Sequence, residues 1–401
     1  MQYKYFVGID ISKDYFSIAI LNTEGEIIRE STFSQVTGDY GKFVTILHNI
    51  TDKDKIVIGL ESSGNYHINL LSYLISKSYN VVLINPILLK NFRDFTNLRR
   101  TKTDKIDATT IAKFIFKNPE NIRNFLPDES VKLIAREREE IAKEIAKIKT
   151  KIKGLVFNIF KELGDIVDIL NKKILNFLLL VPSVRAAREL GEEEVKKRLE
   201  IAFSGKGKNP NISAEDIIKI VRETISIDDI QREIVLQSLI RRLFWLEQEL
   251  DTLTFTLLER IKFFRSREMS ILTSIPGVGE MSAAIFIAEI QNISRFPSYK
   301  KLIAYMGLDP IIIESGKYKR RFRISKRGNP HLRRIIWSIT IGAIFHTHIF
   351  REYYRRKRNN GFKHKKAVIA TANKLIRIIY SLLTNQRAFS TSPHLIPPNS
   401  S

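Results

Sequence analysis

The chain has 401 residues, of which 44% are hydrophobic and 27% charged, proportions typical of a globular protein with a buried core. Its formal net charge of +23 predicts an anionic partner, most commonly nucleic acid, and the absence of cysteine excludes disulfides, thiolate metal sites and cysteine nucleophiles. No apolar run reaches the roughly 18 residues of a membrane span and the N-terminus lacks a signal-peptide pattern, so we expect a cytoplasmic protein with no membrane partner.

Residues 1–128 are predicted to form an α/β domain. Three β-rich runs, YFVGIDI, YFSIAILN and EIIRESTF, are separated by turn signals that favour hairpins. A helical pattern over 39–50, the strand KIVIGLES, a helix over 65–78, the strand VVLINP and two more helices follow. Three antiparallel strands followed by βαβ units are the order of a ribonuclease-H-like (RuvC-like) mixed sheet.

Four acids in this domain occupy positions that suggest a metal site. Asp10 ends the first strand, Glu61 ends the strand KIVIGLES, and Asp104 and Asp107 share one helix face with Ile111. Inward carboxylates are costly and repel one another, whereas a pair of Mg²⁺ ions would satisfy them, since Mg²⁺ prefers hard oxygen ligands. Two metal ions about 4 Å apart can hold both oxygens of a phosphoryl transfer, and Mn²⁺ is an alternative ion.

Each acid also has an ordinary interpretation. A single Asp after a strand is usually a turn or cap residue, and two Asp residues three positions apart usually lie on a solvated helix face. The ordered set of four, each on the matching element, favours the metal site.

Residues 129–260 are predicted to form a helical arm. One heptad seam comprises Ile141, Ile145, Ile148, Ile152, Leu155 and Ile159, and a second comprises Leu236, Leu239, Leu243, Leu246, Leu250, Leu253 and Leu257. The seams predict either an antiparallel coiled-coil arm or a dimer zipper. Between them, about 164–229, we expect a small helical insertion.

Residues 261–384 are predicted to form a mostly helical, basic domain, followed by a disordered tail over 385–401. The segment ILTSIPGVGEMSAAIFIAEI indicates two helices joined by a tight turn, in which Gly277 and Gly279 would expose N–H groups to a phosphate. This turn is like a helix-hairpin-helix, which binds the DNA backbone; an ordinary turn between two helices is the alternative.

A run of basic residues without an acid predicts phosphate contacts from a loop. Its members are Lys317, Lys319, Arg320, Arg321, Arg323, Lys326, Arg327, Arg333 and Arg334. Ser315 opens the run and is a candidate nucleophile for a phosphodiester, although most Ser-Gly pairs are simply turns. A later basic stretch, REYYRRKRNNGFKHKKA, is either a further nucleic-acid surface or a soluble loop.

With these motifs, the chain resembles the insertion-sequence-110 family of DEDD transposases, the bridge-RNA-guided recombinases of mobile elements. The resemblance rests on GIDIS, GLESSGNY and RTKTDKIDA in the first half, and on IPGVG, YMGLDP and ESGKYKRRFRISKRGNPHLRR in the second. It implies a RuvC-like domain, a coiled-coil connection and a C-terminal transposase domain.

The resemblance also implies a mechanism. Asp10, Glu61, Asp104 and Asp107 would bind Mg²⁺, and Ser315 would form a transient phosphoserine link to DNA in a site shared by two subunits. The implied partners are donor DNA, target DNA and a structured guide RNA, with a homodimer that becomes a tetramer on nucleoid DNA. The heptads would then serve dimerisation.

Two features depart from the family pattern. The insertion at 164–229 is longer than the family usually needs, and Glu314 precedes Ser315 where many relatives carry a small polar residue. A carboxylate there would repel a phosphate or help to deprotonate the serine.

Two alternative functions stay open. One is a RuvC-like Holliday-junction endonuclease that uses metal-activated water; the other is a non-catalytic nucleic-acid-binding protein, which the presence of all four acids disfavours.

Overall fold

The fold is that of a computed structural model, which describes residues 3–61, 66–84, 86–96, 104–118, 129–315 and 318–390. The chain divides into two compact units, an N-terminal unit of residues 1–127 and a C-terminal unit of residues 128–401. Each unit is described by itself.

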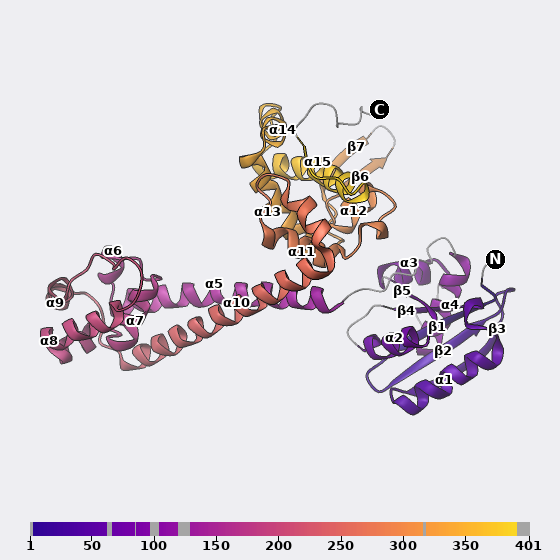
Figure 1. The fold of residues 1–401 in the computed structure, drawn as a ribbon, viewed down its shortest axis with the longest axis horizontal. Coiled ribbons are helices and arrows are strands. Elements are labelled where there is room, and N and C mark those ends of the chain that lie inside the picture. Colours follow the sequence, from indigo (N-terminus) through magenta and orange to yellow (C-terminus); the bar gives the residue numbers. More distant parts are fainter. Residues whose placement is uncertain are drawn as a thin grey trace. The chain divides into compact units, whose positions relative to one another are not determined.

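A five-stranded mixed sheet forms the centre of the N-terminal unit (Figure 1). Its strands are β1 (Tyr5–Ile11), β2 (Tyr15–Leu21), β3 (Ile27–Ser34), β4 (Ile56–Glu61) and β5 (Asn80–Ile84). The strand order is β3-β2-β1-β4-β5, with β1 antiparallel to β2 and parallel to β4. The predicted mixed α/β sheet is therefore confirmed, with three antiparallel strands followed by parallel βαβ additions.

Two hydrophobic cores cover the two faces of this sheet. The helices are α1 (Thr37–Ile50), α2 (His67–Ser76), α3 (Pro86–Thr96) and α4 (Asp104–Lys117), with a short 3-10 helix at Lys53–Lys55. Side chains of α1 and α2 pack on the face that carries Val7 and Ile9, and side chains of α3 and α4 pack on the face that carries Phe6. Alternation along β1 places Gly8 and Asp10 on the second face, with α4.

The C-terminal unit is built on two long helices, α5 (Glu129–Ile159) and α10 (Ile230–Thr273), which pack side by side within one chain (Figure 1). They run antiparallel, since Arg138 near the start of α5 bonds Thr254, whereas Lys149 further along α5 pairs with Glu247, earlier on α10. Most heptad residues are buried between them, among them Ile141, Ile145, Ile148, Ile152, Leu236, Leu243 and Leu246.

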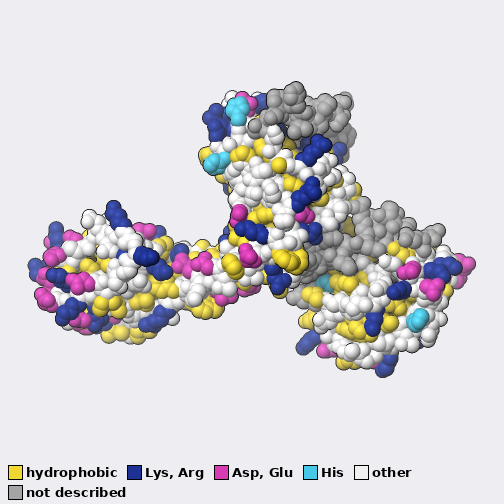
Figure 2. All heavy atoms as spheres, in the orientation of Figure 1, with side chains coloured by type: hydrophobic (Ala, Val, Ile, Leu, Met, Phe, Trp, Pro, Cys, Tyr) yellow, Lys and Arg dark blue, Asp and Glu magenta, His cyan; other side chains and the backbone are white. Residues whose placement is uncertain are grey.

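Four shorter helices cap one end of this pair. They are α6 (Leu163–Ile166), α7 (Lys172–Leu180), α8 (Val184–Phe203) and α9 (Ala214–Glu223), and they share its hydrophobic core. Figure 2 shows Lys and Arg side chains mixed with Asp and Glu side chains over this end of the unit.

At the other end of the pair lies a second core. It contains α11 (Glu280–Ile290), α12 (Tyr299–Tyr305), α13 (Pro330–His346), α14 (His348–Asn359) and α15 (His364–Thr384), a short 3-10 helix at Ile293–Arg295, and a hairpin of β6 (Pro310–Ser315) and β7 (Tyr318–Ile324). Among the described helices, α15 alone has the length and hydropathy of a membrane span, but one face of it is buried in this core, through Ala367, Val368, Leu375, Ile376 and Ile379.

Two sequence predictions need correction. The basic run was expected on a loop, but Lys319, Arg320, Arg321 and Arg323 belong to strand β7, whose Tyr, Phe and Ile residues favour a strand paired with β6. The tail was expected to be disordered from residue 385, but the structure describes residues 385–390 and packs Phe389 on the unit. Phe389 stacks on Phe350, and its N–H donates to the Ser274 hydroxyl. The rest of the tail, 391–401, lies outside the described residues.

Candidate catalytic and nucleic-acid-binding sites

Asp10 and Glu61 lie next to each other at one edge of the N-terminal sheet. The parallel register pairs Ile9 with Leu60, so the next residues, Asp10 near the end of β1 and Glu61 at the end of β4, are neighbours. Both acids are half-buried. The parallel pairing of β1 and β4 therefore places these two acids on neighbouring strands at the same end of the sheet, and their role as metal ligands stays a prediction.

Helix α4 brings Asp107 toward the same edge. The Phe6 ring contacts Phe116 near the end of α4, and a Cβ on Gly8 would lie 2.1 Å from the Ala108 carbonyl oxygen. The helix therefore runs antiparallel to β1, and its first turn lies toward Asp10. Asp104 is the first residue of α4, but its side chain lies outside the described part of the chain.

Asp107 has a cationic neighbour that the sequence analysis did not find. The carboxylate is 4% exposed, and its Oδ1 lies 2.8 Å from Arg93 Nη2 of α3. The pair lacks hydrogen-bond geometry, so Asp107 Oδ1 is a buried oxygen without a hydrogen-bond donor. Helical spacing in α3 could not reveal this contact, because it joins two elements across a tertiary interface.

The donor set fits a hard divalent cation. Carboxylates on β1, β4 and α4 share one edge, and one of their oxygens is buried without a donor. Among the described side chains, no three Asp, Glu or His groups already converge closely enough to hold an ion. Oxygen ligands of this kind suit Mg²⁺ or Mn²⁺.

Gln35 connects the backbone shortly after Asp10 to the backbone that precedes α2. Its Nε2 donates to the Ser12 carbonyl oxygen at 2.6 Å, two residues after Asp10, and to the Tyr66 carbonyl oxygen at 3.4 Å, before α2. The Tyr40 hydroxyl donates to Gln35 Oε1 at 2.6 Å and so orients the amide. A single polar residue in a loop gives no sequence signal for such a role.

Ser315 belongs to the other unit, at the tip of the β6–β7 hairpin. Its backbone pairs with Tyr318, and its side chain lies outside the described residues, as do Lys317 and the side chains of Lys319, Arg320, Arg321 and Arg323. The base of the hairpin is tied by Ser325, whose hydroxyl donates to Asp309 Oδ1 at 2.6 Å and whose N–H donates to the Asp309 carbonyl oxygen at 2.9 Å.

The remaining residues of the basic run differ in their contacts. Lys326 and Arg327 are exposed. Arg333 Nη1 donates to the Met306 carbonyl oxygen at 2.9 Å, and Arg334 pairs with Glu139 at 2.7 Å. The sequence had shown no acid close to these arginines, because Glu139 lies far away in the chain, on α5.

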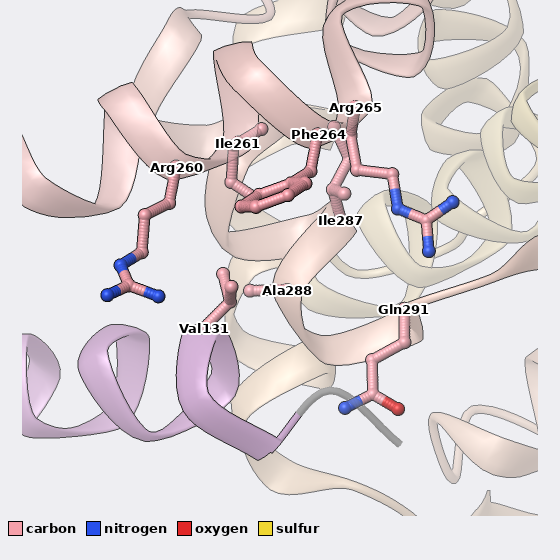
Figure 3. A pocket seen from close by; sticks show the side chains of 8 residues that line it. All are labelled: Val131, Arg260, Ile261, Phe264, Arg265, Ile287, Ala288 and Gln291. Carbon is pink, nitrogen blue, oxygen red and sulfur yellow. The ribbon is translucent and has the colours of Figure 1, made fainter. Parts of the chain in front are cut away.

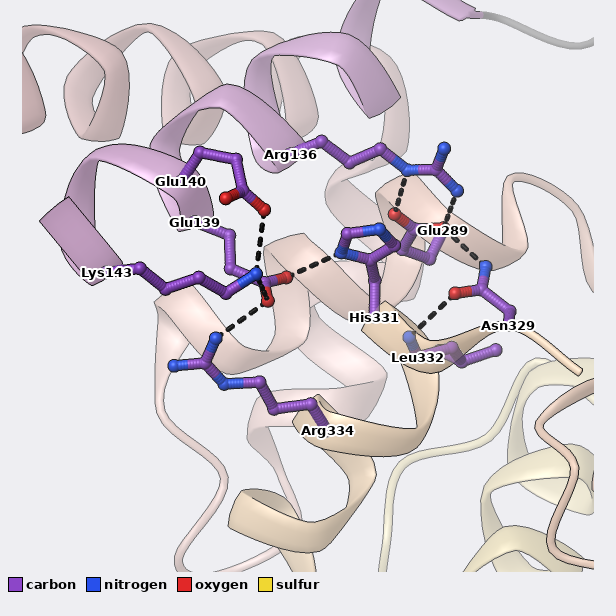
Figure 4. A network of polar contacts seen from close by, with 9 residues as sticks. All are labelled: Arg136, Glu139, Glu140, Lys143, Glu289, Asn329, His331, Leu332 and Arg334. Atoms are coloured by element: carbon purple, nitrogen blue, oxygen red, sulfur yellow. Dashed lines mark hydrogen bonds and ion pairs between the residues drawn. The ribbon is translucent and has the colours of Figure 1, made fainter. Parts of the chain in front are cut away.

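Glu139 and Glu289 organise a polar network between α5, α11 and α13 (Figure 4). Glu289 is 1% exposed and accepts two hydrogen bonds from Arg136, at 2.9 and 3.2 Å, and one from Asn329 at 2.6 Å. Burial would raise the pKa of Glu139, but hydrogen bonds with His331, Lys143 and Arg334 outweigh it and lower the pKa to about 2. The network holds the start of α13, directly after the basic hairpin.

Gly277 and Gly279 differ in their surroundings. Gly277 has a φ of +92°, and a Cβ there would lie 2.3 Å from the Gly342 carbonyl oxygen of α13, so glycine is needed for close packing. Gly279 caps α11, and a Cβ there would meet nothing within 4 Å. The turn thus has one packing glycine and one open position at a helix N-terminus.

A small cavity lies beside the kink of α10 at Arg265 (Figure 3). Its lining is mostly apolar, with the Arg260 and Arg265 guanidinium groups at its sides, and none of the labelled residues is an acid or a hydroxyl nucleophile. This cavity has no chemistry that would make it a catalytic site.

Two family models match separate parts of the chain, and the first of them extends across the N-terminal unit into α5. A family model described as transposase, for the DEDD domain of IS110 elements, matches residues 7–161. A second model, described as the transposase IS116/IS110/IS902 family, matches residues 269–355.

Two individual relatives match along most of the chain, and a third matches over a shorter part. The 44.8-kDa protein of insertion element IS116 from Streptomyces clavuligerus is 22% identical over 97% of this chain and 96% of its own length. The pilin gene-inverting protein of Moraxella bovis is 21% identical over 98% of this chain and 99% of its own length. The transposase for insertion sequence element IS1111A from Coxiella burnetii is 32% identical over 29% of this chain and 33% of its own length.

Proposed function

The chain belongs to the IS116/IS110/IS902 family of transposases and is a DNA transposase or recombinase, and we propose that it excises and inserts a mobile element through a metal-dependent serine mechanism. The observation that carries the proposal is the shared sheet edge of Asp10, Glu61 and Asp107, with a buried Asp107 oxygen that has no hydrogen-bond donor.

Asp10, Glu61, Asp104 and Asp107 would hold one or two Mg²⁺ ions, or Mn²⁺ in their place. When bound, divalent ions supply positive charge to the oxygens of a phosphodiester undergoing substitution. The protein's part is to fix the carboxylates. Gln35 and Tyr40 hold the loop after Asp10, and the close approach of α4 to Gly8 sets the position of Asp107.

Ser315 would be the nucleophile. Its hydroxyl oxygen bonds to phosphorus, the bond from phosphorus to one deoxyribose oxygen breaks, the serine gives up its proton, and the departing hydroxyl takes one. The reverse attack by a DNA hydroxyl on the phosphoserine then rejoins strands without net hydrolysis. Asp309 and Ser325 tie the base of the hairpin whose first strand carries Ser315.

The basic β7 strand would hold DNA or RNA by its phosphates. Arg320, Arg321 and Arg323 lie among the aromatic residues Tyr318 and Phe322 in a strand without an acid, a composition that favours backbone contact over base reading. Choice of donor and target would rest with a structured guide RNA through base pairing. The active assembly would be a homodimer that becomes a tetramer on DNA.

Trapping of a covalent protein–DNA adduct tests the serine mechanism. Purified protein with its guide RNA, donor DNA and Mg²⁺ should give an adduct that resists denaturant, and mass spectrometry should place it on Ser315. Ser315→Ala should abolish the adduct. Asp107→Asn should abolish it too while leaving DNA binding intact, because the metal site would be lost but the basic surfaces would remain.

A junction endonuclease that uses water is distinguished by the same experiment. In that case Ser315→Ala would still cleave DNA and no adduct would form with the unaltered chain. Cleavage without an adduct would therefore overturn the serine mechanism and keep the metal site.

A further inference from the structure

The pair α14–α15 carries an excess of positive charge that the catalytic proposal does not use. Residues 347–377 contain ten Lys and Arg residues and one acid, Glu352, which pairs with His348 at 3.5 Å. All of these residues belong to the described part of the chain. The sequence alone left two interpretations of this stretch, a nucleic-acid surface or a soluble loop, and the structure rules out the loop, since most of it is helical.

Two aromatic rings hold four of these cations in place. Above Tyr353 lie Arg356 at 5.3 Å, Lys357 at 5.2 Å and Lys374 at 4.8 Å from the ring centroid. The Phe362 ring is approached by Lys357 at 5.4 Å and Lys366 at 4.3 Å. We define the α14–α15 cation surface as Tyr353, Arg356, Lys357, Phe362, Lys366 and Lys374.

Like charges so close together repel one another, and this surface contains few acidic residues that could offset the repulsion. Burial and the neighbouring Arg356 lower the pKa of Lys374, the direction expected for an ammonium group in a positive field. Another helix of the same chain shows what a solvated charged face looks like. In α8, Arg185 pairs with Glu189 and Arg198 with Glu194. The α14–α15 cation surface lacks this pairing, so a polyanion is the natural partner.

The burial of the two rings, and the cations over their faces, indicate which kind of polyanion binds. Proteins that bind single strands present open aromatic faces on which unpaired bases stack. Here Tyr353 and Phe362 are half-buried, and their faces are approached by ammonium and guanidinium groups. A duplex, whose bases are stacked internally and whose outer surface is phosphate, fits such a surface.

We propose that the α14–α15 cation surface binds the phosphate backbone of duplex DNA without reading its sequence. The choice of DNA rests on the proposed function, because a recombinase must hold duplex DNA outside the bases being exchanged. The rings act as supports that keep the cations at fixed positions, since a cation over a ring loses less freedom on binding phosphate than a free side chain.

Salt-dependent binding of the full chain to a mixed-sequence DNA duplex, in EDTA to prevent cleavage, tests this surface. The variant Arg356→Gln/Lys366→Gln should bind roughly 10- to 60-fold more weakly at 0.1 M salt, with the slope of log K against log salt reduced by about 1 to 2. The loss should be equal for unrelated sequences. The matched control is Lys206→Gln/Lys208→Gln, which removes two exposed charges from the α8–α9 loop and should leave the slope unchanged.

The rings give a second test that does not change charge. Tyr353→Phe should keep the affinity for DNA, whereas Tyr353→Leu should lower it with the thermal unfolding midpoint unchanged. Equal slopes for Arg356→Gln/Lys366→Gln and its control would overturn the proposal, and so would a loss confined to an RNA duplex of the same length. Neither result would affect the serine mechanism, because the assay requires no strand transfer.

Discussion

Arg93 and Asp107 form an ion pair between α3 and α4, with 2.8 Å from Nη2 to Oδ1, beside the sheet edge that carries Asp10 and Glu61. The pair satisfies the charge of a carboxylate that is almost fully buried, yet it leaves the Asp107 oxygen without a well-directed hydrogen bond. The Arg93 guanidinium neutralises the charge of the Asp107 carboxylate, but a divalent cation would interact with that carboxylate more strongly.

Arg93→Gln should therefore make the stability of the N-terminal unit depend on divalent ions. In EDTA the variant should lose about 3 kcal/mol of unfolding free energy, because a buried charge is left without its partner. Mg²⁺ at 10 mM should restore part of this loss, and chemical denaturation with and without Mg²⁺ measures it. In the control, Arg93→Gln/Asp107→Asn, Mg²⁺ should have no effect. An equal response of both variants to Mg²⁺ would argue against Asp107 as a metal ligand.

Gly277→Ala and Gly279→Ala should differ strongly in stability although both change the same turn. Alanine at 277 meets the Gly342 carbonyl oxygen and must adopt a positive φ, which should cost about 3 kcal/mol. Alanine at 279 points into open space and should cost less than about 1 kcal/mol. Thermal unfolding measures both; similar losses would show that the contact with α13 is not what requires Gly277.

Local pattern was sufficient for much of the fold. Alternation and turn signals gave the strands at Tyr5–Ile11 and Ile56–Glu61, and the heptads gave the buried residues Ile145 and Leu243. Strand β7 was missed because its Arg and Lys residues suggested a loop. Packing of Phe389 was missed because a polar, Pro- and Ser-rich context outweighed one aromatic residue.

Some residues of the candidate site could be predicted from the sequence and others could not. The positions of Asp10, Glu61 and Asp107 on their strands and helix could be predicted, since strand ends and helix spacing are local features, whereas their role as metal ligands stays a prediction. Arg93 and Gln35 could not, because each acts across a tertiary contact that no spacing encodes. Glu139 likewise gave no signal that it would meet Arg334, 195 positions along the chain.

Glu139→Gln should remove a stabilisation that depends on pH. The pKa of Glu139 is about 2 in the folded protein, below its usual 4.5, so the folded state binds fewer protons between these values. The stabilisation is fully present above pH 4.5 and is lost as the pH falls toward 2. We expect a difference of about 1–2 kcal/mol between the unaltered chain and Glu139→Gln at pH 6, allowing for solvent screening.

Urea unfolding of both proteins at pH 6, 4 and 3 measures this difference, which should shrink steadily with falling pH. A difference that stays constant would assign the effect to packing rather than to the carboxylate charge. Glu140→Gln serves as a control, because Glu140 is exposed and contacts only Lys143 within this network.

Arg320→Ala and Arg321→Ala should each weaken DNA binding by a similar factor for every sequence tested. Each substitution should lower the slope of log K against log salt by about 1 if one phosphate contact is lost. Fluorescence anisotropy over a range of salt concentrations gives both quantities. A changed sequence preference would contradict backbone contact by β7 and indicate reading of bases.

Formation of the circle junction in cells that carry the whole native element tests most directly the proposal that recombination needs both the metal ligands and Ser315. The junction is measured by amplification across the abutted element ends for the unaltered chain, Asp107→Ala and Ser315→Ala, at matched protein levels. We predict junctions for the unaltered chain and none for either variant. Junctions that persist with Ser315→Ala but disappear with Asp107→Ala would contradict the serine nucleophile and leave a nuclease that uses metal and water.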